Sequence, residues 1–296
     1  MASFSSRTAW RFATSTYEKW SRDNVPQLGA SLAFYTALSI APLLVISLAI
    51  GAFVFGDEAA RGEVASQMRT LIGGQGAHAI EEMIESADRP TSGVTATVLG
   101  VLMLLFGASG VFGELQQSLN KIWEVEVKED RGFVRIIRER VFSFVMVLGI
   151  AFLLLVSLVL STVLATLGKF FSHLPDSVAW LSQILNFSVS FVIITLLFAM
   201  IFKILPDAKI AWWQVWLGAS LTALLFSVGK FFIGLYLGRS SMASSYGVAG
   251  SFVVLLVWVY YSSQILYLGA EITKVYAEMS GSKVGPTAIA KPHSRR

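Results

Sequence analysis

Six stretches of the chain contain no Asp, Glu, Lys or Arg, and each is long enough to cross a lipid bilayer as a helix. The shortest holds about 20 residues, which at 1.5 Å per residue matches a hydrocarbon core roughly 30 Å thick. Only 14% of the 296 residues are charged, too few to cover a soluble surface of this size. The sequence therefore predicts an all-α, polytopic integral membrane protein with six transmembrane helices, near 28–55, 93–113, 141–167, 181–205, 214–238 and 249–273.

The segments outside these spans define the rest of the organisation. In residues 1–27, Trp10, Tyr17 and Trp20 share one helical face opposite a basic one, which predicts a cytoplasmic amphipathic helix in the membrane interface. Two short amphipathic patterns within 57–92 predict an extracytoplasmic helical hairpin. The six spans form one transmembrane domain over 28–276. The Gly, Pro and Arg residues of 277–296 predict a disordered basic cytoplasmic tail.

Lys and Arg are distributed unevenly about the spans. The N-terminal segment, the loops 114–140 and 203–213, and the tail hold 17 of the 23 basic residues. By the positive-inside rule, these segments and both termini face the cytoplasm. The net charge of +4 fits anionic lipid headgroups better than nucleic acid. Three arginines that share a face before the third span are expected to contact those headgroups, with a specific regulatory site as the alternative: Arg131, Arg135 and Arg138.

Charged side chains within the spans are candidates for function, because each costs about 2.5–3.5 kcal/mol to insert into hydrocarbon. The sequence has three, Glu114, Lys230 and Glu271. Two have plain structural explanations. Glu114 can pair with Lys121 at the interface, and Lys230 can extend to the outer headgroups.

The sixth span carries the clearest polar pattern. Its polar residues follow at spacings of 4, 3 and 4, so they lie on one face of an otherwise apolar helix. They line a path for a cargo, or they hold the bundle together by interhelical hydrogen bonds. Pro42 predicts a kink in the first span. The full set of candidate cavity or path residues is Tyr35, Ser39, Glu114, Gln117, Asn120, Lys230, Tyr260, Gln264, Tyr267 and Glu271.

Three motifs resemble the YihY/BrkB family of bacterial inner-membrane proteins, and the resemblance extends from about residue 11 to 276. They are Gln27-Leu-Gly-Ala-Ser-Leu-Ala-Phe-Tyr35 with Ser39-Ile-Ala-Pro42, the stretch from Gly107 to Trp123, and Ser245-Tyr-Gly through Trp258-Val-Tyr-Tyr to Leu268-Gly-Ala-Glu271. The resemblance implies a six-helix bundle in the bacterial inner membrane. The family's older name, ribonuclease BN, is widely regarded as a misassignment.

The residues agree that no nuclease or other enzyme is to be expected. The three histidines lie in separate segments, there are no cysteines, and no metal, cofactor or nucleotide-binding motif is present. A membrane enzyme acting on lipid would need paired intramembrane carboxylates, which the sequence does not show.

Two functions remain open. The leading hypothesis is a transporter-like protein that moves or accommodates a lipid or small solute through a polar cavity within the six-helix bundle. The alternative is a structural or partner-organising membrane protein without cargo, in which the 114–140 loop and the N-terminal helix are the working parts. Membrane lipids are the expected partners. Self-association stays open, since Gly234 and Gly238 form a GxxxG pair.

Overall fold

The computed structural model describes part of the chain, and that part divides into two compact units. Unit 1 comprises Met1–Ile122 and Leu225–Glu271, and unit 2 comprises Trp123–Leu224 and Ile272–Arg296. The described residues are 6–39, 56, 62, 110–127, 179–239, 250–282, 284–287 and 290–292.

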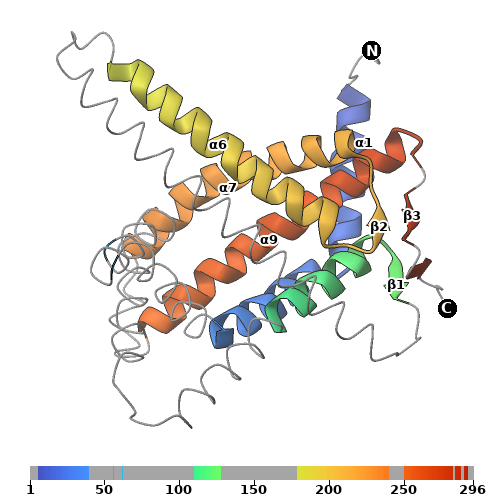
Figure 1. The fold of residues 1–296 in the computed structure, drawn as a ribbon, viewed down its shortest axis with the longest axis horizontal. Coiled ribbons are helices and arrows are strands. Elements are labelled where there is room, and N and C mark those ends of the chain that lie inside the picture. The colour runs from blue at the N-terminus through green and yellow to red at the C-terminus, as the bar shows by residue number, and fades with distance from the viewer. Residues whose placement is uncertain are drawn as a thin grey trace. The chain divides into compact units, whose positions relative to one another are not determined.

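Helices dominate the described residues (Figure 1). Those with defined ends are α1 (Ser6–Arg22), α6 (Ala179–Ile204), α7 (Trp212–Arg239) and α9 (Gly250–Met279). Residues 25–39 and 110–122 are helical as well. Four short strands accompany them: β1 (Val125–Val127), β2 (Ala208–Lys209), β3 (Gly285–Pro286) and β4 (Ala290–Pro292).

Three helices are long and apolar enough to cross a membrane, within Phe187–Ile204, Trp212–Ile233 and Phe252–Met279. They confirm that the predicted spans 181–205, 214–238 and 249–273 are long apolar helices, although α9 continues six residues past its predicted end to Met279. Only 28% of the first two windows is buried within the protein, against 44% of the third. Their outward apolar surface is suited to lipid.

The other predicted spans lie wholly or largely outside the described residues. The described portions of the first two, 28–39 and 110–113, are helical. The third span and Pro42 lie outside, as does the hairpin within 57–92 apart from residue 62. The three arginines Arg131, Arg135 and Arg138 also lie outside the described residues.

The predicted amphipathic helix within 1–27 is present as α1. Its Trp10 and Tyr17 side chains are 72% and 67% exposed, whereas Thr16 on the other side is buried. The helix ends where Asn24 adopts a left-handed conformation, with φ of 54°, which asparagine tolerates better than most residues. An exposed aromatic face suits a membrane interface, and that location stays a prediction.

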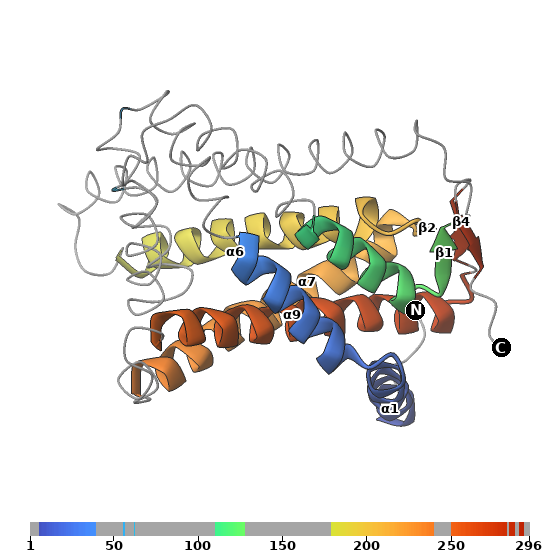
Figure 2. The ribbon, with the colours of Figure 1, turned by 90° about the horizontal axis from the view of Figure 1, so that it is seen from below.

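In unit 1, glycines allow close approach between helices. Gly29 in helix 25–39 meets the side chain of Gln264 on α9, and a Cβ on Gly110 would lie 3.1 Å from the Tyr35 ring. Helices 25–39, 110–122 and the unit 1 part of α9 therefore pack together (Figure 2). This agrees with the general use of small residues at membrane helix crossings.

In unit 2, the start of α7 packs on the end of α9. Gly218 leaves room for the buried Thr273 side chain. The rings of Trp213 and Tyr276 meet edge to face with centroids 5.4 Å apart. Two antiparallel ladders complete the unit, in which β1 pairs with β4 and β2 pairs with β3.

The prediction that 277–296 is a disordered tail is wrong for the described part of that segment. α9 runs to Met279 and ends where Gly281, with φ of 71°, lets Ser282 N donate to Ala277 O, a standard helix-terminating motif. The chain then forms β3 and β4, and Ala290 is buried. Composition alone missed these strands because their partners, β1 and β2, lie far away in the sequence.

Candidate functional site

The polar row on α9 changes its surroundings along the helix. Tyr260 is 37% exposed and Gln264 is half-buried, whereas Tyr267 and Glu271 are both 0% exposed. The four residues share a helical face, as the spacing predicts, yet only the last two lie fully inside the protein. Gln264 and Tyr267 fall at the middle of the apolar window Phe252–Met279.

Tyr267 lies against the helix 110–122. Its hydroxyl is beside the Ser118 side chain and within electrostatic range of Glu114. The two hydroxyl oxygens do not reach hydrogen-bond geometry. The structure thus brings together two predicted residues, Glu114 and Tyr267, with one that the sequence analysis missed. Ser118 follows Glu114 by four residues, so the same helical face could have indicated it.

Gln264 lies against the helix 25–39. Its Nε2 donates a long hydrogen bond, 3.4 Å, to the backbone carbonyl of Val25. Its Oε1 has no hydrogen-bond partner among the described residues. Three buried polar atoms at this level of unit 1 have no hydrogen-bond partner within the part of the chain that the structure describes: Ser118 Oγ, Gln264 Oε1 and Tyr267 Oη.

The remaining candidates lie less close to the cluster formed by Ser118, Gln264 and Tyr267. Ser39 Oγ donates 2.8 Å to the Tyr35 carbonyl of its own helix, so its hydroxyl is satisfied locally. The Tyr35 side chain is partly exposed and contacts Gly110. On helix 110–122, Gln117 is exposed and Asn120 is buried.

The charged candidates differ in their surroundings. Glu114 is half-buried and forms no ion pair with Lys121 within the described part of the chain. Lys230 is half-buried beside the exposed rings of Phe231 and Phe232. No ion pair joins it to another described residue, which leaves the headgroup interpretation of Lys230 open. Glu271 is fully buried on α9.

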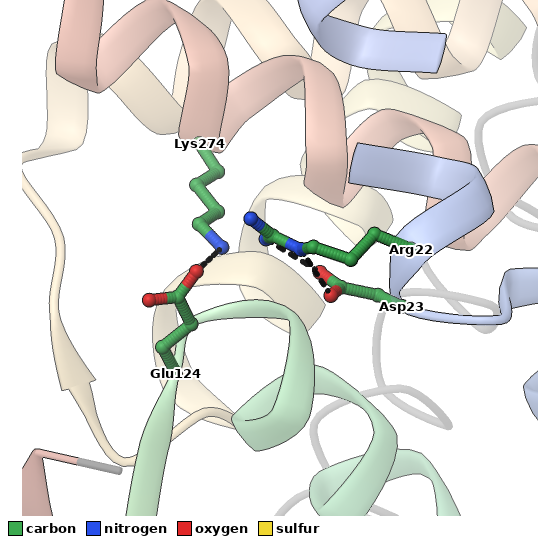
Figure 3. Close-up of polar contacts among 4 residues, drawn as sticks. All are labelled: Arg22, Asp23, Glu124 and Lys274. Carbon is green, nitrogen blue, oxygen red and sulfur yellow. Dashed lines mark hydrogen bonds and ion pairs between the residues drawn. The ribbon is translucent and has the colours of Figure 1, made fainter. Parts of the chain in front are cut away.

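Unit 2 contains an ion pair that the sequence analysis did not anticipate. Lys274 Nζ donates to Glu124 Oε1 at 2.8 Å (Figure 3). Glu124 sits in the turn before β1, with φ of 54°. One feature of the sequence could have placed Lys274 on the helix. No glycine or proline lies between Glu271 and Gly281, so the helix continues past the predicted end of the span at residue 273. Figure 3 also shows a pair in unit 1, Arg22 Nε to Asp23 Oδ1 at 3.0 Å, at the end of α1.

This ion pair borders a groove of about 610 Å³, a volume typical of small-ligand sites. Trp123 lines the groove, and its indole N–H has no partner among the described residues. The lining residues are Trp123, Glu124, Val125, Lys274, Glu278, Gly281, Ser282, Val284, Pro286 and Pro292.

Exposed aromatic residues also gather in unit 2, at the start of α7. Trp212, Trp213 and Trp216 are exposed at the start of α7, and Trp213 contacts Tyr276. The Lys203 ammonium, in the last turn of α6, lies 5.6 Å from the Trp212 ring centroid. Tryptophan, tyrosine and lysine gather where a span leaves the hydrocarbon.

Neither location has the ligands of a metal site. Among the residues that the structure describes, no three His, Asp or Glu side chains gather closely enough to hold a metal ion.

Comparison with known proteins gives a family and no activity. The model of the family described as virulence factor BrkB matches residues 16–293. Curated relatives are named only UPF0761 membrane protein. Those of Verminephrobacter eiseniae, Tolumonas auensis and Actinobacillus pleuropneumoniae are 28%, 26% and 26% identical, each over 90% of this chain. The aligned parts cover 63%, 86% and 94% of those proteins, so the first is considerably longer than this chain. No solved structure matches the chain.

Proposed function

Because this chain belongs to the virulence factor BrkB family of membrane proteins, we propose that it moves or accommodates a lipid or small solute along buried polar positions between its helices. The family match and the three long apolar helices establish a membrane protein. The cargo, a bacterial inner-membrane location and a non-enzymatic mode of action are parts of the proposal.

One observation carries the proposal, a cluster of polar atoms near the middle of α9 that have no hydrogen-bond partner among the described residues. Ser118 Oγ, Gln264 Oε1 and Tyr267 Oη are buried, and Gln264 and Tyr267 lie at the middle of the apolar window of α9. Side chains that only hold a bundle together are expected to pair with one another, because an unmade hydrogen bond is expensive in hydrocarbon. Polar atoms without a partner among the described residues are therefore candidates to meet the polar group of a cargo.

Because the cluster is buried, transport would require the helices around it to separate. Tyr267 is fully buried, so under this proposal its hydroxyl is closed to a cargo in the observed arrangement. A cargo can reach the hydroxyl only when α9 separates locally from helix 110–122. Such gating by displacement of packed helices is common among membrane transporters.

The test is reconstitution of the full chain into liposomes with parallel assays of lipid scrambling and solute uptake. Ser118→Ala with Tyr267→Phe removes two of the polar atoms with little change in shape, and we expect the rate to fall at least tenfold. The matched control is Ser263→Ala, since the buried Ser263 hydroxyl is already paired with Val259 O at 2.7 Å. A wild-type rate in the double variant, or no activity of the wild type in either assay, would overturn the proposal.

The competing proposal, a partner-organising protein without cargo, predicts the opposite pattern. Crosslinking in cells would then recover one stoichiometric partner, and the double variant would keep wild-type function. The exposed aromatic face of α1, with Trp10 and Tyr17, is the described surface that such a partner could use.

Orientation is a separate part of the proposal, with both termini in the cytoplasm. The chain has no cysteine, so single cysteines can report topology directly. We expect Ser21→Cys and Ser280→Cys to be shielded from an impermeant thiol reagent in intact cells and Gly62→Cys to react. All three positions are exposed. Labelling in the reverse pattern would place the termini outside.

A further inference from the structure

Two helices that meet in unit 1 are joined again in unit 2 by the segments that follow them. Helix 110–122 and α9 meet where the Ser118 side chain lies beside Tyr267. Beyond this contact, helix 110–122 leads through a two-residue turn into β1, and the end of α9 leads into the tail strands. Because the chain is continuous, contacts between these following segments limit how far the two helices can separate.

The first of these contacts is the ion pair between Lys274 and Glu124. Glu124 is the second residue after helix 110–122 ends, and Lys274 lies five residues before the end of α9. Glu124 has a φ of 54°, a left-handed conformation that residues other than glycine rarely adopt. Contacts of the turn must hold this conformation, and the 2.8 Å bond to the Lys274 ammonium is one of them.

The second contact is the ladder between β1 and β4. Its strands are antiparallel, with Glu126 directly opposite Lys291. Val125 and Ala290 are only 6% and 4% exposed, so part of the ladder packs into the protein. The Glu126 and Lys291 side chains are partly exposed, with their charged groups 3.7 Å apart. The ladder thus ties the chain beyond α9 to the chain beyond helix 110–122.

This ladder is weak enough to open while the helices stay folded. Each of its strands has three residues, and a two-stranded ladder by itself is marginally stable in water. The exposed pair of Lys291 and Glu126 adds little to it. By contrast, α9 has 30 residues and its own backbone hydrogen bonds. Opening of the ladder is therefore a local event.

From these contacts we propose that the tail acts as a latch, formed by the β1–β4 ladder and the Lys274–Glu124 ion pair. While the latch is closed, helix 110–122 and α9 stay packed at Tyr267. When β4 leaves β1, the turn at Glu124 relaxes and the two helices separate at that level. The latch rests on the proposed function in one respect, since the separation that it controls is the one that would admit a cargo.

The experiment locks the latch with a disulfide in the full chain, which has no cysteine of its own. Glu126→Cys with Lys291→Cys places two thiols directly opposite each other in the ladder. Opposite residues of antiparallel strands have Cα atoms about 4.5–5.5 Å apart, within the range of a disulfide. A third change, Ser118→Cys, reports separation of the helices. Its side chain is 1% exposed in the observed arrangement, so its thiol reacts with N-ethylmaleimide only when the helices part.

The measurement is the rate at which the thiol at position 118 reacts in liposomes, followed by peptide mass spectrometry. We expect this rate to be at least about tenfold lower in the oxidised protein than after reduction and removal of the reductant. Ser118→Cys alone should react at one rate under both conditions. Equal rates in the oxidised and reduced forms of the locked chain would overturn the proposal.

The matched control places a disulfide in the other ladder of the same tail. Lys209→Cys with Gly285→Cys joins β2 to β3, where the two residues are also directly opposite. No described residue lies within 4 Å of a Cβ on Gly285. Because this disulfide leaves β4 free to leave β1, it should slow the reaction at position 118 by less than about twofold. Equal slowing by the two disulfides would overturn the proposal.

A change of charge tests the latch without a disulfide. Glu126→Lys places two lysines opposite each other, and like charges in that position destabilise a ladder. We expect the reaction of the thiol at position 118 to become about threefold faster. Adding Lys291→Glu reverses the pair and should restore the original rate. A rate that stays unchanged in Glu126→Lys would contradict the latch.

Transport measured in the same liposomes separates this proposal from the proposed function. For this measurement the chain carries Glu126→Cys and Lys291→Cys and keeps Ser118. Latch-dependent reaction at position 118 in a protein that moves neither lipid nor solute would overturn the proposed function and support the latch. Full transport by the oxidised chain would overturn the latch and leave the proposed function standing.

Discussion

Lys274 on α9 is held by Glu124, 150 residues earlier in the chain, with 2.8 Å between Nζ and Oε1. The lysine side chain is 6% exposed and the glutamate side chain 31%. A buried ammonium is strongly unfavourable unless a partner compensates its charge. The pair therefore ties the last part of α9 to the start of β1, and both residues line the groove.

Breaking this pair should destabilise the protein. Removing one partner of a buried ion pair typically costs about 3–5 kcal/mol, and because Glu124 is partly exposed we expect about 2 kcal/mol for Glu124→Gln. The measurement is the free energy of unfolding in mixed micelles. Lys291→Met is the control. Lys291 and Glu126 are 3.7 Å apart and their side chains are 46% and 36% exposed, so the loss of free energy of unfolding should stay under about 0.5 kcal/mol. If both variants lost the same free energy of unfolding, the Lys274–Glu124 pair would be no more buried than the Lys291–Glu126 pair.

The crossing of α7 and α9 should not tolerate an added methyl group. In Gly218→Ala, the new Cβ would lie 2.8 Å from the Thr273 Cβ, and Thr273 is fully buried and branched. We expect the free energy of unfolding to fall by about 1–3 kcal/mol because the added methyl group overpacks the crossing. Gly113→Ala serves as the control because no described residue lies within 4 Å of the position that its new methyl group would take, and alanine favours the helix by about 1 kcal/mol. The prediction fails if the melting temperatures of the two variants shift together.

Tyr267→Phe should leave stability unchanged or raise it by up to about 1 kcal/mol, because the buried hydroxyl that it removes has no partner among the described residues. The comparison variant is Thr222→Val. The buried Thr222 hydroxyl donates to Gly218 O at 2.6 Å, so its removal should lower the free energy of unfolding by about 0.5–1 kcal/mol. The measurement is thermal unfolding of both variants and the wild type in the same detergent. A loss on Tyr267→Phe larger than that on Thr222→Val would mean that the hydroxyl is satisfied, and the argument for a cargo position would lose its basis.

Truncation after Ser282 should expose β1. The tail strand β4 pairs with β1 in the register Glu126 to Lys291, so its removal frees the β1 edge. Hydrogen exchange of the amides in 125–127 should accelerate by at least tenfold, while α9 keeps its protection. Lys291→Ala keeps the strand and removes only the ion pair, and it should leave exchange at β1 near the wild-type rate. Unchanged exchange in the truncated chain would show that the β1–β4 ladder contributes little.

Much of the fold followed from local sequence. Stretches without charge predict long apolar helices because a chain in lipid must satisfy its backbone within each segment, and α6, α7 and α9 lie where those stretches predict them. The spacing of Trp10 and Tyr17 predicted α1, and the spacing of Gln264, Tyr267 and Glu271 predicted their common face. The family also followed from sequence motifs alone.

The sequence by itself determined the membrane class of the protein, three of its long helices and the polar face of α9, because all of these depend on neighbours within a few residues. Only the tertiary structure decided that Ser118 lies beside Tyr267, that Lys274 is buried against Glu124, and that the tail forms strands. Those contacts join residues from separate segments, and their energies depend on burial and distance, which helical spacing does not contain. For the same reason the polar row on α9 was predictable from the sequence. The groove beside Lys274 was not predictable, nor was the lack of a partner for Gln264 Oε1 and Tyr267 Oη among the described residues.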